Sequence, residues 1–222
     1  MIYANQENEI VMRTIYLLRH CETKHDLKKR CVGITDIPLN ETGIRHAQRL
    51  KEYFMDKGLS RVFCSNALRS IRTAKIISGG KIQVTEFPAL HEINMGDWDG
   101  MYFEDIKLKF PEEYRQRGLD FASFAPPNGE SFAVCQIRAL TAFQNILENT
   151  HGNLAIVSHA GFNRALLCSF CKINLQELFT IPQPFGCVNI LSMQDGICHV
   201  EKIGFEIDKN DGYDDAQTGV MK

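Results

Sequence analysis

Two histidines stand in equivalent places, each directly after an apolar run that is typical of a buried strand. His20 follows the run Thr14–Leu18 and Arg19. His159 follows Asn153–Ser158. In an open α/β sheet, ligands bind outside the carboxyl ends of the strands, so the two imidazoles can share one pocket although they lie far apart in the chain. A neutral imidazole is a nucleophile and a guanidinium binds anions, so this pattern indicates chemistry on an anionic substrate.

Other features near these histidines also favour an anion. Gly161 allows a tight turn after His159, and the N–H groups that open the next helix would attract negative charge. Arg69 lies near the start of the expected helix Ala67–Ile77, where a cation opposes the helix dipole unless an anion accompanies it. Arg72, further along that helix, fits an ordinary solvated face.

Glu92 is a candidate for proton transfer. It lies in the stretch LHEINMGDWDG, between His91 and a turn region that contains Gly96, Gly100 and Trp98. Loops carried by a rigid scaffold often hold catalytic side chains. A lone loop glutamate is more often simply solvated, so the case for Glu92 rests on these neighbours.

The elements that must position these residues alternate along the chain. Hydrophobic spacing and turn residues predict strands followed by helices, and strands that are apolar on both faces predict a mostly parallel sheet sandwiched by helices. We expect strands at Thr14–Leu18, Arg61–Cys64, Lys81–Phe87 and Asn153–Ser158, a terminal hairpin of Cys187–Met193 and Ile197–Ile203 around Asp195 and Gly196, and helices at Glu41–Lys57, Ala67–Ile77, Tyr102–Arg117, Glu130–Asn149, Gly161–Cys171 and Leu175–Phe179.

Composition limits the kind of partner. With 222 residues, 44% of them hydrophobic, the chain can bury one substantial core. A formal charge of -2 gives no reason to expect nucleic acid or a membrane surface as a partner, which leaves a small molecule. No apolar run reaches a membrane span and the first residues do not resemble a signal peptide, so a cytoplasmic location is expected.

The ends of the chain and its cysteines are expected to lie outside the chemistry. Residues 1–12 read as an N-terminal extension, 13–207 as the domain and 208–222 as a flexible acidic tail. Eight cysteines in a chain with no apparent export signal are most simply reduced, packed thiols. Cys168 and Cys171 form a CxxC without a second metal-spaced pair, so no metal is expected.

Five motifs in order resemble the histidine phosphatase superfamily, the phosphoglycerate mutase-like proteins, from about Arg13 to Ile203. They are RHCETKHD, GITDIPLNETG, SNALRSIRTA, LHEINMGDWDG and SHAG. The resemblance implies a three-layer α/β/α sandwich with a mostly parallel central sheet and a helical cap insertion at about 98–130. It also implies a cytoplasmic enzyme without a cofactor that acts on a small phosphorylated metabolite, with a homodimer as the family-level assembly.

The resemblance also implies roles for individual residues. His20 is the expected phosphoryl acceptor, Arg19, Arg69 and His159 the clamp on the phosphoryl group, and Glu92 the general acid and base. Thr35 and Ala160 are further candidates for substrate binding. The chemistry agrees, because a phosphoryl group in transfer carries charge on its equatorial oxygens and requires positioned cationic donors. The attacking imidazole must be neutral, with its tautomer fixed by a hydrogen bond from the other nitrogen, for which a backbone carbonyl is the expected partner.

Two residues depart from the family pattern. Asp26 replaces the usual asparagine, a binding position for the phosphoryl group, and an ionised carboxylate there would repel phosphate. We therefore expect Asp26 to be protonated or turned toward Lys24, Lys28 or Lys29, or the loop to be displaced. Cys21 replaces the usual glycine beside two cationic residues, which predicts a lowered thiol pKa and inhibition by oxidation.

The segment between Glu92 and His159 is compact, which favours a phosphatase over a mutase. The stretches GDWDGMYFEDIKLKFPEEYRQRGLDFASFAPPNGESF and IPQPFGCVNIL resemble the α-ribazole phosphatase branch, which acts on α-ribazole 5′-phosphate in cobalamin biosynthesis. Aromatic side chains could stack on the flat base or belong to the core: Trp98, Tyr102, Phe103, Phe121 and Phe124. Open alternatives are a broad-specificity, phosphoserine or sugar-phosphate phosphatase, a phosphoglycerate mutase, and a phosphate-binding protein without turnover.

Overall fold

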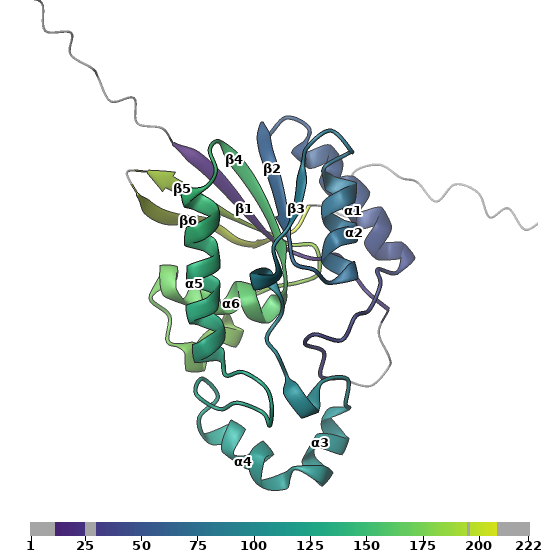
Figure 1. Ribbon diagram of the computed structural model, residues 1–222, viewed down its shortest axis with the longest axis vertical. Coiled ribbons are helices and arrows are strands. Elements are labelled where there is room, and N and C mark those ends of the chain that lie inside the picture. The colour runs from purple at the N-terminus through teal and green to yellow at the C-terminus, as the bar shows by residue number, and fades with distance from the viewer. Residues whose placement is uncertain (1–11, 25–29, 195, 208–222) are drawn as a thin grey trace, which may run out of the picture.

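A six-stranded sheet with helices on both faces organises the protein (Figure 1). The computed structural model describes residues 12–24, 30–194 and 196–207. The strand order is β3-β2-β4-β1-β5-β6. The first four strands run parallel, β5 runs antiparallel to β1, and β6 runs antiparallel to β5. This confirms the predicted α/β fold with a mostly parallel sheet. The strands are β1 (Arg13–Arg19), β2 (Leu59–Cys64), β3 (Val84–Glu86), β4 (Asn153–Ser158), β5 (Val188–Gln194) and β6 (Ile197–Phe205).

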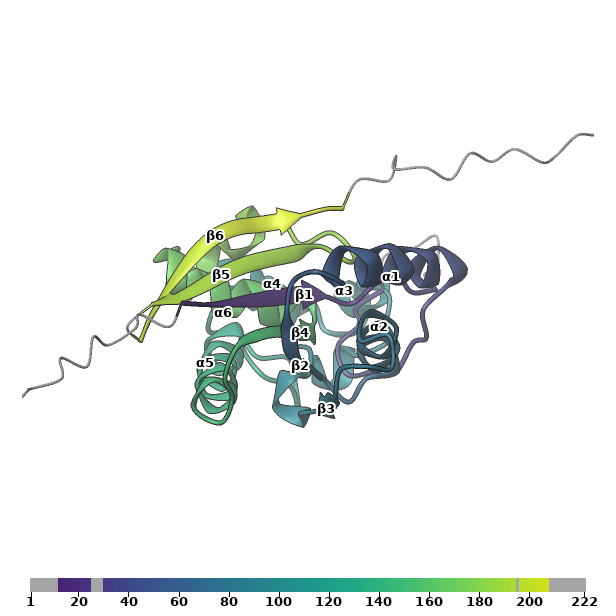
Figure 2. The same ribbon diagram turned by 90° about the horizontal axis from the view of Figure 1, so that it is seen from above.

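The helices divide between the two faces of the sheet. Seen from above, α1 and α2 lie on one side and α5 and α6 on the other (Figure 2). The helices are α1 (Glu41–Phe54), α2 (Leu68–Ile77), α3 (Phe103–Lys109), α4 (Pro111–Leu119), α5 (Phe132–Glu148) and α6 (Ala160–Cys171), with short 3₁₀ turns η1 (Pro88–Leu90), η2 (Gly96–Trp98) and η3 (Leu175–Thr180).

Alternation along the central strand explains why its sequence is apolar throughout. Ile15 and Leu17 pack into the core beneath α5 and α6. Tyr16 and Leu18 pack into the core beneath α1 and α2. Successive side chains of a strand point to opposite faces, and here both faces are covered. The strand is therefore held from both sides where it delivers His20.

The single helix expected over Tyr102–Arg117 is wrong. The structure has two helices, α3 and α4, which meet at Phe110 (φ −131°, ψ 56°). Pro111 is the reason, because a proline restricts the residue before it and is accepted only in the first turn of a helix. Strand β3 is also shorter than expected, covering only Val84–Glu86. None of the described helices is long and apolar enough to cross a membrane.

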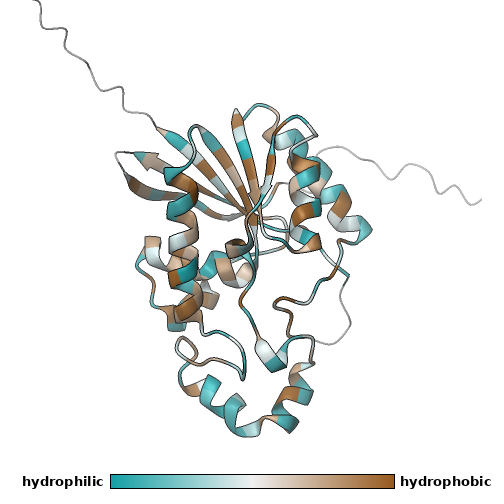
Figure 3. Ribbon diagram, viewed as in Figure 1, coloured by the Kyte–Doolittle hydropathy of each residue, from teal (hydrophilic) through white to brown (hydrophobic). Residues whose placement is uncertain are grey.

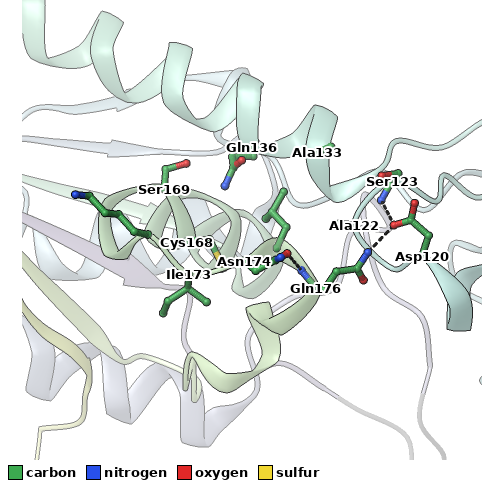
Figure 4. A pocket seen from close by; sticks show the side chains of 12 residues that line it. Asp120, Ala122, Ser123, Ala133, Gln136, Cys168, Ser169, Ile173, Asn174 and Gln176 are labelled. Carbon is green, nitrogen blue, oxygen red and sulfur yellow. Dashed lines mark hydrogen bonds between the residues drawn. The ribbon is translucent and has the colours of Figure 1, made fainter.

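Helices α3 and α4 lie in the segment 98–130, called the cap segment below, and both lie away from the sheet (Figure 1). Helix α4 has no buried residue and is coloured mainly hydrophilic in Figure 3. Gln176 ties the end of the cap segment to η3: its Nε2 donates to Asp120 (2.6 Å) and its Oε1 accepts from the N–H of Phe121 (3.0 Å). Figure 4 shows this contact at the rim of a cavity of about 770 Å³, which contains none of the site residues expected from the sequence.

Candidate active site

Strand register brings the two motif histidines together. In the parallel pair β1 and β4, Arg19 stands opposite Ser158, so the next residue of each strand emerges at the same edge. The N–H of His20 donates to the carbonyl of Ser158 (2.9 Å). The ring centroids of His20 and His159 are 5.2 Å apart, and both side chains are buried.

His20 is arranged as a neutral nucleophile. Its Nδ1 lies 2.8 Å from the carbonyl oxygen of Cys21, which accepts a hydrogen bond from the Nδ1–H and leaves Nε2 as the free nucleophilic atom. Burial, followed by the charges of Arg19 and Arg69, lowers the pKa of His20 well below its usual value. The imidazole is therefore unprotonated at neutral pH, as an attacking nitrogen must be.

Arg69 is fixed by two backbone carbonyls. Its Nη1 donates to the carbonyl of Thr35 and its Nη2 to that of Gly33, each at 2.8 Å. Gly33 permits this approach of the loop, because a Cβ there would lie 2.4 Å from the carbonyl oxygen of Ile93. The hydroxyl of Thr35, expected to bind substrate, donates instead to Asp99 (3.0 Å). The carbonyl of Thr35 thus helps to fix Arg69, and the residue also lies at the cavity described below.

Arg19 is held differently. Its Nη1 donates to the carbonyl of Gln183 (2.6 Å), and its Cζ lies 3.7 Å from the centroid of the Phe185 ring. Its Nε is buried without a hydrogen-bond partner in the described chain. Burial lowers the pKa of Arg19 to about 10, an effect that the nearby Glu92 opposes. The guanidinium stays charged at neutral pH.

Glu92 occupies the start of α6. Its carboxylate accepts the N–H of Gly161 and of Phe162, both at 3.0 Å. The sequence suggested that these donors would meet a bound anion, but the anion here is the protein's own carboxylate, placed where a helix dipole favours negative charge. A Cβ on Gly161 would lie 2.6 Å from Glu92 Oε1, so the glycine makes room for the carboxylate rather than serving a tight turn.

One ring nitrogen of His159 is hydrogen-bonded and the other is not. Its Nε2 lies 2.7 Å from the hydroxyl of Ser65, whereas its Nδ1 is buried with no hydrogen-bond partner among the described residues. Burial, then the charges of His20, Arg69 and Arg19, lowers its pKa well below the usual value. Ser65 lies in the motif SNALRSIRTA, but the sequence gave no sign that it supports His159.

Most of these groups line one cavity of about 740 Å³, a size suited to a small metabolite. The predicted residues that line it are Arg19, His20, Thr35, Arg69, Glu92 and Ala160. The ring of His159, 5.2 Å from that of His20 between centroids, is not part of the lining. Asp26 lies outside the described residues. Six residues that line the cavity or hold its side chains were not predicted from the sequence: Ser65, Asp99, Arg117, Arg164, Gln183 and Phe185.

The expectation of aromatic stacking on a ligand is only partly met. Phe103 and Phe121 line the cavity. Trp98 is fully buried and packs against Phe124, with ring centroids 5.3 Å apart, so these two belong to the core. Tyr102 is absent from the lining, and the Arg30 guanidinium lies 4.5 Å from its ring centroid.

Residues 12–24, 30–194 and 196–207 contain no group of three or more His, Cys, Asp or Glu side chains that could hold a metal ion. Cys168 and Cys171 are free thiols, and burial raises the pKa of each.

The predicted reactivity of Cys21 is wrong in its physical basis. Cys21 is fully buried, and burial raises the pKa of its thiol to about 12. Because the thiolate is the reactive form, we expect hydrogen peroxide to inactivate wild type and Cys21→Ala at the same rate. The measurement is residual phosphatase activity against time of exposure to peroxide. Protection in the variant would restore a redox role to Cys21.

The chain is similar in sequence to known proteins over most of its length. A 6-phosphofructo-2-kinase/fructose-2,6-bisphosphatase from Gallus gallus is 28% identical over 209 residues, covering 93% of this chain and 43% of its own length. The Arabidopsis thaliana protein of that name is 30% identical over 212 residues, covering 93% and 27%. The chain therefore spans less than half the length of these curated relatives.

Solved structures match nearly end to end. Bacillus stearothermophilus YhfR has a TM-score of 0.80 at 32% identity, with 88% of this chain and 98% of that one covered. The α-ribazole phosphatase from Shigella flexneri has a TM-score of 0.80 at 25% identity, with 86% and 96% covered. The family model of the histidine phosphatase superfamily (branch 1) matches residues 15–206. The chain belongs to the histidine phosphatase superfamily.

Proposed function

We propose that this phosphatase hydrolyses a small phosphate monoester that carries a second anionic group, with His20 as the phosphoryl acceptor. One observation carries the proposal: among the described residues, the cavity lining has a large excess of positive charge. Glu92 is its one carboxylate. The basic side chains of the lining are Arg19, Lys24, Arg30, Arg69, Arg117 and Arg164.

The inner part of the cavity handles the transferred phosphoryl group. Arg19 and Arg69 supply two positive charges, which match the dianion of one monoester, and His159 Nδ1 adds a hydrogen bond. His20 Nε2 attacks phosphorus, forming the N–P bond as the P–O bond to the alcohol breaks. Glu92 acts as the acid in its protonated form and gives its proton to the departing alkoxide. The carboxylate that remains then takes a proton from the water that hydrolyses the phosphohistidine, which restores the acid and releases inorganic phosphate.

Three arginines of the lining lie outside this inner set, and two of them, Arg117 and Arg164, project from helices. Arg117 projects from α4, with its Cζ 4.5 Å from the Phe121 ring centroid, and burial lowers its pKa. Arg164 projects from α6, and its Nε donates to the carbonyl of Ile181 (2.9 Å). Within the described ranges, neither has a carboxylate as an ion-pair partner. Partly buried cations without a counterion favour a ligand that brings a second negative group.

The curated relatives agree with a doubly anionic substrate. Their name describes a fructose-2,6-bisphosphatase, and a bisphosphate carries two anionic groups. A sugar bisphosphate is therefore the first substrate class to examine, which develops the sugar-phosphate alternative drawn from the sequence.

α-Ribazole 5′-phosphate, in cobalamin biosynthesis, is the second candidate. The Shigella flexneri structure supports it, as does the aromatic wall that could contact a flat base. That wall consists of Phe103, Phe121, Phe132 and Phe179. This substrate has a single phosphate, so it would leave Arg117 and Arg164 unmatched.

Phosphate release from four compounds separates the candidates. These are fructose 2,6-bisphosphate, 3-phosphoglycerate, α-ribazole 5′-phosphate and an aryl phosphate. We expect kcat/KM to be highest for one of the two compounds with a second anionic group. A clear preference for α-ribazole 5′-phosphate would instead support the cobalamin role, and equal values for all four would indicate a broad-specificity phosphatase.

Replacing Arg117 by methionine should change specificity more than catalysis. Losing one charged contact to a partly buried anion costs about 2 kcal/mol, so kcat/KM for the preferred doubly anionic compound should fall roughly 30-fold. The aryl phosphate, which lacks a second anion, should be little affected. Arg115→Met is the matched control, because Arg115 lies exposed on the same helix and pairs with Glu112. A loss of equal size on both substrates would contradict a second anion site at Arg117.

A further inference from the structure

The two arginines of the inner site are held by different means. Arg69 donates to two backbone carbonyls, which fix its guanidinium in position and in plane. Arg19 has one side-chain hydrogen bond to a carbonyl, that of Gln183, and its Nε has none within the described chain. One hydrogen bond leaves a planar group free to turn about its axis. Another contact must therefore set the plane of Arg19.

Phe185 supplies that contact. The Arg19 Cζ lies 3.7 Å from the Phe185 ring centroid, a stacking distance, and the same ring lies 5.6 Å from that of His20. A guanidinium is attracted to the face of an aromatic ring, and the attraction is larger where water is excluded. Phe185 is half-buried and lines the cavity, so it covers one face of the guanidinium and leaves the edge toward the substrate free.

A buried amide network fixes the segment that carries Phe185. The Gln183 Nε2 donates to Asn189 Oδ1 (2.7 Å), and its Oε1 accepts from Asn163 Nδ2 (3.0 Å). Asn189 Nδ2 also donates to the carbonyl of Leu17 in β1 (2.9 Å). These three amides therefore tie the segment 182–187 to α6, β5 and β1.

The backbone on either side of Phe185 is tied to the same strand end. The N–H of Gly186 donates to the carbonyl of His20 (3.1 Å), and the N–H of Arg19 donates to the carbonyl of Cys187 (3.2 Å). These backbone hydrogen bonds fix the distance between the Phe185 ring and the Arg19 guanidinium. Its place relative to Arg19 does not depend on a bound ligand.

We infer that Phe185 is a positioning residue for phosphoryl transfer, which orients the Arg19 guanidinium by stacking on it. The inference rests on the proposed role of Arg19 in binding the phosphoryl group. It goes further by predicting that an aromatic face, rather than apolar volume, is what this position requires.

The test compares Phe185→Leu with Phe185→Tyr. Leucine keeps an apolar side chain but removes the aromatic face, so kcat/KM for the aryl phosphate should fall about tenfold, and the inhibition constant of inorganic phosphate should rise by a similar factor. Tyrosine should retain most of both. Phe170→Leu is the control for a general loss of packing, because Phe170 on α6 packs against Phe143 on α5, outside the cavity lining.

The outcomes separate this inference from the proposed function. Loss of activity in His20→Ala together with unchanged phosphate inhibition in Phe185→Leu would overturn the positioning role alone. Equal losses in the leucine and tyrosine variants, with lowered Tm in both, would also overturn it by indicating packing. Full activity in His20→Ala would overturn the proposed function instead, whatever the Phe185 variants show.

Discussion

Replacing His20 by alanine is expected to lower kcat by about 10⁴-fold or more on every monoester, because removing a nucleophile removes the covalent route. His20 has the neutral ring, the fixed Nδ1 and the adjacent Arg19 and Arg69 that this route requires. The variant should still bind inorganic phosphate, since both arginines and His159 remain.

Trapping the phosphoenzyme tests this expectation directly. Wild type mixed with a labelled aryl phosphate and quenched at high pH should retain label on the protein, and His20→Ala should retain none. His199→Ala is the matched control, since His199 lies exposed on β6. Label on the His20→Ala protein would assign the acceptor to another residue.

Replacing Glu92 by glutamine should give the second large effect, and its size should depend on the leaving group. An alkyl phosphate needs a proton on its departing oxygen, so its kcat should fall by about 10²–10⁴-fold. An aryl phosphate with a good leaving group does not need that proton, and its rate of phosphoenzyme formation should change little.

The glutamine also removes a charge from the start of α6. One of its two terminal atoms becomes a donor facing the N–H of Gly161 or Phe162, so Tm should fall as well. Rates are therefore compared below the Tm of the variant, with Glu86→Gln on β3 as an exposed control. Equal losses on alkyl and aryl substrates would contradict the role of Glu92 as an acid.

Much of the fold and the inner site could be predicted because local sequence encodes them. Thr14–Leu18 and Asn153–Ser158 are apolar on both faces, and each places a histidine where parallel strands end. The break between α3 and α4 is also encoded locally, by Pro111, although the apolar spacing continues across Tyr102–Arg117.

Other properties depended on contacts between distant residues. Cys21 follows two basic residues in sequence, yet it lies in the core beneath α1 and α2, so burial and not its sequence neighbours determines its pKa. The donors at the start of α6 meet Glu92, about 70 residues earlier in the chain. Nothing in one sequence distinguishes Arg117 or Arg164, in the cavity, from an arginine on a solvated helix face.

The central position of β1 has a consequence for biosynthesis. β1 is translated first of all the strands, but its two neighbours in the sheet, β4 and β5, are translated late. Its contact from Leu17 to Asn189 spans 172 residues, which at typical ribosomal rates corresponds to roughly 10–30 s. For most of that interval, until β4 has been translated, β1 has no partner strand, and His20 and His159 cannot meet. Phosphatase activity should therefore emerge only after β4 and β5 have been translated, and slow or paused ribosomes would prolong the period in which a strongly apolar strand is open to aggregation.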